Sequence, residues 1–147
     1  MAVTASGLFV PTFLDILDAT QLAVNTASDT FKVAMITNSS TPDFDTHDEW
    51  SDLSGNEVSG TNYSAGGVAL ASVTLTGSSG TIKFDAADSS WSTSTISSAR
   101  AAVIYDDTLS GDKLICLVDF GADYSSANGT FTITWNASGI WTLDLTP

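Results

Sequence analysis

Alternation of polar and apolar residues is the strongest pattern along this chain, and it is typical of strands with one buried face. Residues 130–135 alternate without interruption, so Phe131, Ile133 and Trp135 lie on one face of an expected strand. Turn residues follow, and the alternation resumes over residues 140–145. The two segments predict a β-hairpin.

Denser apolar segments predict strands that are covered on both faces. Residues 101–105 and 114–120 are nearly continuous in apolar side chains, and a polar stretch separates them. Runs this short and this rich in branched or aromatic residues are typical of central strands. We expect a second hairpin here, a third from residues 68–76 and 81–84, and a single strand over residues 31–37.

Two segments depart from the strand pattern. Phe13, Ile16 and Leu17 recur at helical spacing, and this predicts a short amphipathic helix over residues 11–19. Residues 38–67 are rich in Gly, Ser, Asn and Asp and predict a long loop that folds back on the domain or contacts a neighbour. We therefore expect an all-β fold: an antiparallel β-sandwich or small barrel of about seven strands, with one short N-terminal helix and a long loop.

The length and composition fit one folded domain rather than a disordered chain. With 147 residues, of which 43% are hydrophobic and only 14% charged, the chain can bury one ordinary core. We expect an N-terminal arm over residues 1–12 and a single β-rich domain over residues 13–147. The chain begins without the basic segment that opens a secretory signal, so we do not expect such a signal here.

The charge of the chain removes several classes of function. There are 17 acidic side chains against 4 basic ones, which gives a formal net charge of −13. Four basic side chains cannot neutralise a run of phosphates, and we therefore expect no nucleic-acid partner. The apolar stretches span only a few residues each, so we expect no membrane partner.

Candidate catalytic residues do not form a recognisable motif. Cys116 is the only cysteine and lies within an apolar stretch, so we expect a small buried side chain and no intramolecular disulfide. His47 stands near Asp45 and Asp48, but no nucleophile elbow, phosphate-binding loop or dinucleotide-binding glycine pattern accompanies it. We expect no enzyme activity, no catalytic residue and no cofactor.

The densest acidic segment raises calcium as an alternative. Asp43, Asp45 and Asp48 lie close together in the sequence, and Ca²⁺ takes hard oxygen ligands of this kind. The EF-hand pattern fails, because His47 occupies an alternate ligand position and the required glycine is missing. A solvated loop whose aspartates cap turns is the competing interpretation, and we therefore predict no metal site.

Apolar residues without an evident place in the core predict an interface. The N-terminal arm is apolar at several positions, yet it precedes the first expected element. Two aromatic residues are embedded in the long polar loop. The expected interface residues are Val3, Leu8, Phe9, Val10, Phe13, Trp50 and Tyr63.

Several stretches, taken in order, resemble a group of small β-rich virion structural proteins of tailed bacteriophages. They are FKVAMIT (31–37), NEVSGTNYSAGGV (56–68), FDAADSSW (84–91), and AAVIYDD (101–107) followed by LICLVDFG (114–121). The resemblance covers roughly residues 30–145 and leaves the N-terminal arm outside. Members of the group are similar to head-associated accessory proteins of the decoration or cement kind, and some belong to tails or fibres.

The resemblance implies a function that needs no reactive centre. We expect a head decoration or cement protein that binds the major capsid protein, stabilises the shell and forms a homo-oligomer, with a trimer matching local three-fold positions. Its expected location is the virion, assembled in the host bacterial cytoplasm. The alternatives are a receptor- or glycan-binding module of a tail fibre or spike, and a calcium-stabilised secreted β-domain.

Overall fold

The structure is a computed structural model that describes residues 2–146, and Met1 and Pro147, the ends of the expected arm and domain, lie outside the described residues. Residues 2–146 contain one α-helix, α1 (Val10–Leu17), and two short 3₁₀ helices, Trp50–Asp52 and Ser54–Asn56. The strands are β1 (Gly7–Leu8), β2 (Phe31–Ile36), β3 (Gly60–Thr61), β4 (Val68–Ala69), β5 (Thr74–Ser78), β6 (Thr81–Asp85), β7 (Ser89–Asp106), β8 (Lys113–Ile133) and β9 (Trp141–Asp144).

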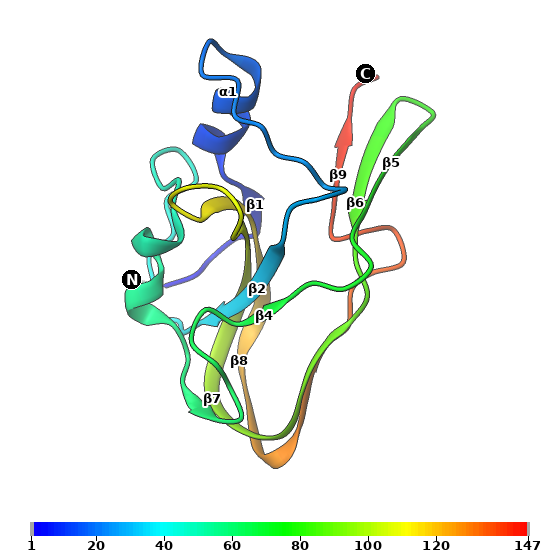
Figure 1. The fold of residues 1–147 in the computed structure, drawn as a ribbon. Coiled ribbons are helices and arrows are strands. Elements are labelled where there is room, and N and C mark those ends of the chain that lie inside the picture. The colour runs from blue at the N-terminus through cyan, green and yellow to red at the C-terminus, as the bar shows by residue number, and fades with distance from the viewer. Residues whose placement is uncertain (1, 147) are drawn as a thin grey trace.

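The strands form two antiparallel sheets (Figure 1). Sheet A has the order β1-β8-β7-β2-β4, and β3 adds to it by pairing with β7. Sheet B has the order β5-β6-β9. Antiparallel sheets with a single N-terminal α-helix in the described chain confirm the expected all-β class. Among residues 2–146, no helix has the length and apolar character required to cross a membrane.

Strands β7 and β8 form one long hairpin that bends through the molecule. They span 18 and 21 residues and pair with each other through several register shifts. Thr93 and Ser98 have positive φ values of 51° and 56° inside β7, next to these shifts. Bulges of this kind bend strands, and Figure 1 shows the hairpin running down one side and turning up the other. The hairpin expected over residues 101–105 and 114–120 is therefore confirmed as one end of a longer hairpin.

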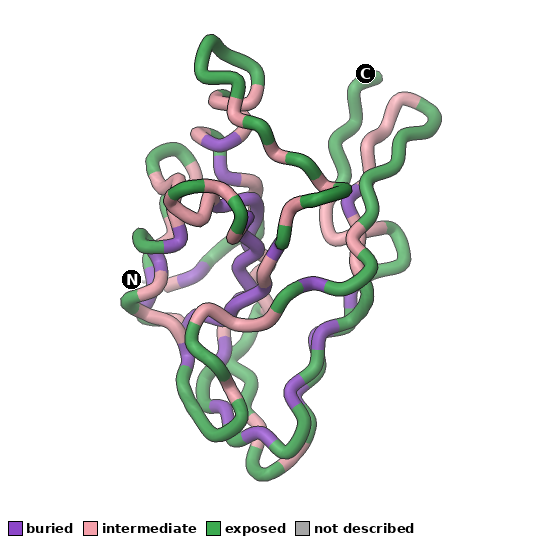
Figure 2. Tube along the Cα trace, in the orientation of Figure 1, coloured by how far each residue is buried: buried purple, intermediate pink, exposed green. Residues whose placement is uncertain are grey.

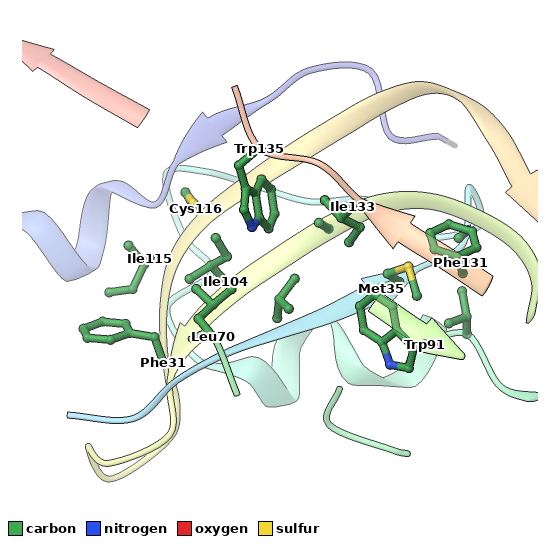
Figure 3. Packing of buried hydrophobic residues seen from close by; sticks show 14 of the residues in the cluster. Phe31, Met35, Leu70, Trp91, Ile104, Ile115, Cys116, Phe131, Ile133 and Trp135 are labelled. Atoms are coloured by element: carbon green, nitrogen blue, oxygen red, sulfur yellow. The ribbon is translucent and has the colours of Figure 1, made fainter. Parts of the chain in front are cut away.

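The central strands are covered on both faces, as their dense apolar sequence predicts. In β2, Val33 and Met35 face one hydrophobic cluster while Ala34 and Ile36 face another, and all four side chains are fully buried. Figure 3 shows the first cluster, in which Trp135 and other large side chains pack over sheet A. The N-terminal segment and the long loop supply the cover on the second face.

One predicted hairpin is wrong in its pairing. Residues 130–133 are the end of β8 and pair with β7, whereas β9 pairs with β6 through positions such as Phe84↔Trp141. The expected faces are nevertheless correct, because Phe131 and Ile133 are both buried. Alternation specifies the face on which a side chain lies, but it does not specify which strand lies alongside.

The strand predicted over residues 68–76 is divided between the two sheets. β4 pairs with β2 in sheet A, and β5 pairs with β6 in sheet B. Between them Ser72 has a positive φ of 53°, which redirects the chain. The predicted pairing of this region with residues 81–84 and the predicted strand over residues 31–37 are confirmed.

The N-terminal segment packs as part of the domain. β1 pairs with β8 through Leu8↔Cys116, and α1 follows almost directly. Thr12 is buried and donates its hydroxyl hydrogen bond to the carbonyl of Leu114 at 2.6 Å. The predicted helix is confirmed with slightly earlier bounds. The described part of the expected arm, residues 2–12, contains β1 and the start of this helix.

Candidate functional site

The residues expected at an interface lie mostly inside the domain. Val3 and Phe9 are 0% exposed, and Trp50 is 8% exposed. Leu8 and Phe13 are half-buried against the first hydrophobic cluster. These residues were predicted at an interface because no segment of the domain was expected to pack against them. The structure corrects this expectation, because all five pack within the domain.

Specific contacts hold the N-terminal segment against sheet A. The Val3 amide donates to Asn38 Oδ1 at 3.0 Å, and Arg100 Nη2 donates to the Val3 carbonyl at 3.3 Å. Ala34 and Ala101 are fully buried on the face that this segment covers. Small side chains on a sheet leave room for a covering segment with larger ones. The two alanines are therefore the signal in the sequence that another segment packs over this face of sheet A.

The long loop folds back on the domain, which is one of the two outcomes expected for it. The ring of Trp50 stacks on the ring of Tyr105 in β7. The Trp50 amide donates to the carbonyl of Asp112 at 2.9 Å, and Leu53 is buried in the same cluster. Trp50 is therefore a core residue and is not available to a partner.

Tyr63 lies at the centre of a partly buried hydrogen-bond network. Its hydroxyl oxygen accepts a hydrogen bond from the Met35 amide at 3.0 Å and donates to Glu57 Oε1 at 2.8 Å. The same carboxylate oxygen accepts from the Gly66 amide at 2.7 Å, and the Tyr105 hydroxyl donates to the Gly66 carbonyl at 2.7 Å. Burial raises the pKa of Tyr63 far above its usual value, so the phenol stays protonated. These hydrogen bonds hold residues 57–66 of the long loop against β2 and β7.

Two of the aspartates considered as calcium ligands, Asp43 and Asp48, accept hydrogen bonds from groups of the protein. The Asp45 amide donates to Asp43 Oδ1 at 2.9 Å, and this hydrogen bond lowers the pKa of Asp43. Asp48 accepts a hydrogen bond from Lys113 Nζ at 2.7 Å, and His47 Nδ1 accepts from the Asp43 amide at 3.3 Å. Within residues 2–146, no three His, Cys, Asp or Glu side chains are grouped so as to hold a metal ion. The geometry gives calcium no support.

Helix α1 presents an apolar stripe to solvent. Val10, Leu14 and Leu17 recur at i, i+4 and i+7, so they lie along one side of the helix. They are 41%, 59% and 84% exposed, in that order. Asp18 follows the helix directly and is also exposed. We call Val10, Leu14 and Leu17 the α1 stripe.

The other side of α1 faces the domain. Phe13 packs edge-on against Trp141 of β9, with ring centroids 5.8 Å apart, and Thr12 is buried. Because these two residues take the inward positions, Leu17 points outward, contrary to the face that its spacing from Phe13 predicts. The residues predicted at an interface include Val10 but neither Leu14 nor Leu17. Their spacing from Val10 was the available signal.

Every lysine and arginine of the chain is ion-paired. The pairs are Lys32–Asp107 at 2.9 Å, Lys83–Asp85 at 3.2 Å, Arg100–Asp119 at 3.0 Å and Lys113–Asp48 at 2.7 Å. The side chains of these pairs are 14–35% exposed, so each pair still reaches solvent, and an ion pair in contact with solvent contributes little stability, about 0–1 kcal/mol. With 17 acidic side chains in total, the carboxylates in excess of these pairs make the surface strongly anionic.

The bend of β8 borders an open hollow of about 390 Å³. Tyr124 is 52% exposed there, and it lies edge-on to Phe120 with ring centroids 6.2 Å apart. Hydroxyl-bearing residues complete much of the lining: Ser125, Thr130, Thr132 and Thr134. An exposed aromatic ring bordered by hydroxyls can stack on a sugar ring and hydrogen-bond to it.

A buried carboxyl group lies at the end of β7. Asp106 is 0% exposed, and its Oδ1 accepts from the Thr108 amide at 3.0 Å. Its Oδ2 has no hydrogen-bond partner among the described residues. Burial raises the pKa of Asp106 to about 6, and the nearby Asp29 carboxyl adds to this rise. We therefore expect the stability of the folded chain to depend on pH in the mildly acidic range.

The chain matches no model of a known protein family, no curated protein and no solved structure. Three features of the described residues bear on binding: the α1 stripe, the anionic surface and the hollow beside β8.

Proposed function

We propose that this chain is a non-enzymatic structural protein of a tailed-bacteriophage virion, a head decoration or cement protein that binds the major capsid protein. The observation that carries the proposal is the α1 stripe, a row of exposed apolar side chains on an anionic body. Exposed leucines gain free energy when another protein covers them. A decoration protein needs an adhesive face of this kind and no catalytic group.

The charge around the α1 stripe indicates what kind of surface on the capsid protein would bind it. Asp15 and Asp18 lie on and directly after α1, beside the stripe, and the chain as a whole carries −13. The matching surface on the capsid protein is an apolar patch with basic residues at its rim. The electrostatic part of this binding weakens as salt is added, whereas the apolar part remains.

Stabilisation of the shell follows from mass action. A protein that binds the assembled shell, and not its separate subunits, lowers the free energy of the shell by its own free energy of binding. Each contact can be small, because a molecule that touches two neighbouring capsomers binds the second at high effective concentration. The proposed location is the virion, after assembly in the host bacterial cytoplasm.

For the architecture we propose a partial β-sandwich. The supporting contact joins the sheets: Phe84 of β6 packs edge-on against Phe31 of β2, with ring centroids 5.6 Å apart. Sandwiches bury apolar side chains between two inner sheet faces in this way. A rigid body of this kind holds α1, and with it the α1 stripe, in a fixed orientation.

The test is co-sedimentation of the purified chain with phage heads assembled from the major capsid protein of the same genome. The double substitution Leu14→Gln and Leu17→Gln removes two exposed apolar side chains and keeps residues that favour helix. We expect head occupancy to fall at least about tenfold, because each leucine contributes about 1.5–3 kcal/mol when fully covered. Circular dichroism should show unchanged folding.

Tyr124→Gln is the matched control, since Tyr124 is similarly exposed on a different element. It should bind heads as the unmodified chain does. An unmodified chain that does not sediment with heads overturns the proposal, and equal loss of binding in both variants overturns the role of the α1 stripe.

The hollow beside β8 favours a second candidate, a receptor- or glycan-binding module of a tail fibre or spike. Trp50 and Tyr63 are engaged within the domain, so Tyr124 is the ring available for stacking there. Saturable binding on a glycan array, lost in Tyr124→Ala and kept in Leu14→Gln with Leu17→Gln, would favour this candidate. A decoration protein should show no such binding.

A further inference from the structure

The outer edge of sheet B is open along β5. Within residues 2–146, β5 pairs with β6 on one side and with no strand on the other, and all five of its residues are exposed. Figure 1 shows β5 and β6 projecting from the body of the molecule, and Figure 2 shows β5 exposed along its length. An open edge presents unpaired backbone N–H and C=O groups that another strand can bind.

β5 carries none of the features that commonly protect an edge. Its sequence, TLTGS, has no charged residue and no proline, and its pairing with β6 runs without a bulge. The surrounding sequence is also neutral, because residues 58–82 contain no charged side chain in a chain that carries −13. A second copy therefore meets less repulsion along β5 than along β9, the other edge, which contains Asp144.

The turn between β5 and β6 decides which backbone groups point outward. Its two residues have positive φ values of 50° and 78°, as in the two-residue turns that close hairpins. In such hairpins the flanking pair, here Ser78 and Thr81, exchanges hydrogen bonds, and bonding pairs then alternate along the strands. Thr76 also bonds toward β6 by this alternation. The N–H and C=O groups of Leu75 and Gly77 point to the open side.

The side chains of sheet B divide between an apolar and a polar face. The register places Leu75 opposite Phe84 and Phe84 opposite Trp141, so these three side chains share one face. Leu143, two residues after Trp141, lies on that face too. Leu75 and Leu143 are 46% and 38% exposed, so the apolar face continues beyond the part that the core covers.

We propose that β5 pairs antiparallel with β5 of a second copy of this chain, about a two-fold axis at Thr76. In this register Leu75 of one copy lies opposite Gly77 of the other, and the outward N–H and C=O groups of both are bonded across the axis. Gly77 has no side chain, which leaves room for the Leu75 side chain beside it. The two three-stranded sheets become one sheet of six strands.

Symmetry favours a second copy over a foreign strand. An isologous contact requires a surface that is complementary to itself. The outward-bonding residues Leu75 and Gly77 lie at equal distances from Thr76, so β5 meets this requirement. The pairing gives a dimer in place of the trimer that three-fold capsid positions suggest. It does not depend on the proposed binding to phage heads, because β5 lies outside the α1 stripe.

Cysteine cross-linking tests the register. Thr76→Cys places two thiols across the axis, at the Cα spacing of about 4.5 Å that non-hydrogen-bonded pairs adopt. Disulfides form at this spacing. Thr74→Cys is the matched control, since it lies on the same strand and face but away from the axis. The native thiol of Cys116 does not compete, because it is buried and burial raises its pKa to about 12.

We expect Thr76→Cys to form a disulfide-linked dimer under mild oxidation in the absence of phage particles, and Thr74→Cys to remain unlinked. Cross-linking of both variants to the same extent, or of neither, overturns the proposed pairing. Because no phage component is present, this outcome is separate from the outcome of the head-binding experiment.

Light-scattering mass after size-exclusion chromatography gives an independent test. The unmodified chain should show twice its 15.3 kDa mass at high concentration. Leu75→Pro removes an N–H that points away from β6, so it should give a monomer that keeps the fold. Leu143→Gln, on the opposite edge, should remain a dimer. A chain that is monomeric at every concentration, or a Leu75→Pro variant that stays dimeric, overturns the proposal.

Discussion

The indole ring of Trp50 lies parallel to the phenol ring of Tyr105, with centroids 5.1 Å apart and ring planes 4° apart. Tyr105 belongs to the central strand β7, and Trp50 begins the first 3₁₀ helix of the long loop. The stacked rings hold this polar loop against β7 and cover a face of the strand that solvent would otherwise reach. An aromatic residue that stands among acids in the sequence is therefore a structural anchor.

Trp50→Ala should destabilise the folded chain by about 3–5 kcal/mol, because it leaves a cavity over Tyr105. Urea-induced unfolding measures this change. Ser51→Ala alters the next residue, which is exposed, and should change stability by no more than about 0.5 kcal/mol. Equal effects of the two substitutions would contradict an anchoring role for the stack.

Tyr63→Phe should cost about 1–3 kcal/mol of stability. The substitution removes the acceptor of the Met35 amide and the donor to Glu57, and leaves both groups partly buried. Tyr124→Phe is the control, because Tyr124 is 52% exposed and its hydroxyl can bond to water in the folded chain. Thermal unfolding of both variants checks the difference, and no loss in Tyr63→Phe would argue against the network.

Stability should fall as the pH rises from about 4 to about 6 through the titration of Asp106. In the folded chain this carboxyl keeps its proton up to a pKa of about 6, whereas its ordinary pKa is 3.8. The folded state therefore binds more protons in this window, and its stability decreases with rising pH. The contribution is complete below the ordinary pKa and is lost above about pH 6.

Asp106→Asn isolates this contribution. The free energy of unfolding of the variant should rise relative to that of the unmodified chain as pH increases through the window, because the amide does not titrate. Urea unfolding of both proteins on each side of the window gives the comparison. A difference that stays constant with pH would show that Asp106 does not titrate in this way.

Gly67→Ala should destabilise the chain by more than about 1 kcal/mol. Gly67 has a positive φ of 72°, and a Cβ added there would meet the backbone of Val33 in β2. Gly55→Ala is the control, because a Cβ at that position meets nothing within 4 Å. Denaturant unfolding of the two variants distinguishes them, and similar midpoints would mean that this turn tolerates a side chain.

The parts of the fold that depend on local pattern were predictable from the sequence. The unbroken apolar character of residues 101–105 indicated a strand covered on both faces, and its side chains are buried. The alternation over residues 130–135 placed Phe131 and Ile133 on the buried face. Such patterns report the surroundings of each side chain, and those surroundings repeat with the period of the strand.

The parts that depend on distant segments were not predictable in this way. Nothing near Val3 or Phe9 in the sequence indicates that both cover the second face of sheet A. The inward face of α1 was predicted only in part: Phe13 faces the domain as expected, but Leu17 does not. Thr12 was missed, because a buried Thr12 is favourable only when its hydroxyl reaches the carbonyl of Leu114, 102 positions away. The self-association and the head binding proposed above remain predictions.

The placement of the four basic residues has a consequence for proteolysis. Lys32, Lys83, Arg100 and Lys113 all lie within strands, and the loops of residues 2–146 carry no lysine or arginine. Trypsin cuts after these residues only when it can draw an extended segment into its cleft, and a strand bonded to its neighbours does not enter. Digestion of this chain by trypsin should therefore report how often its sheets come apart.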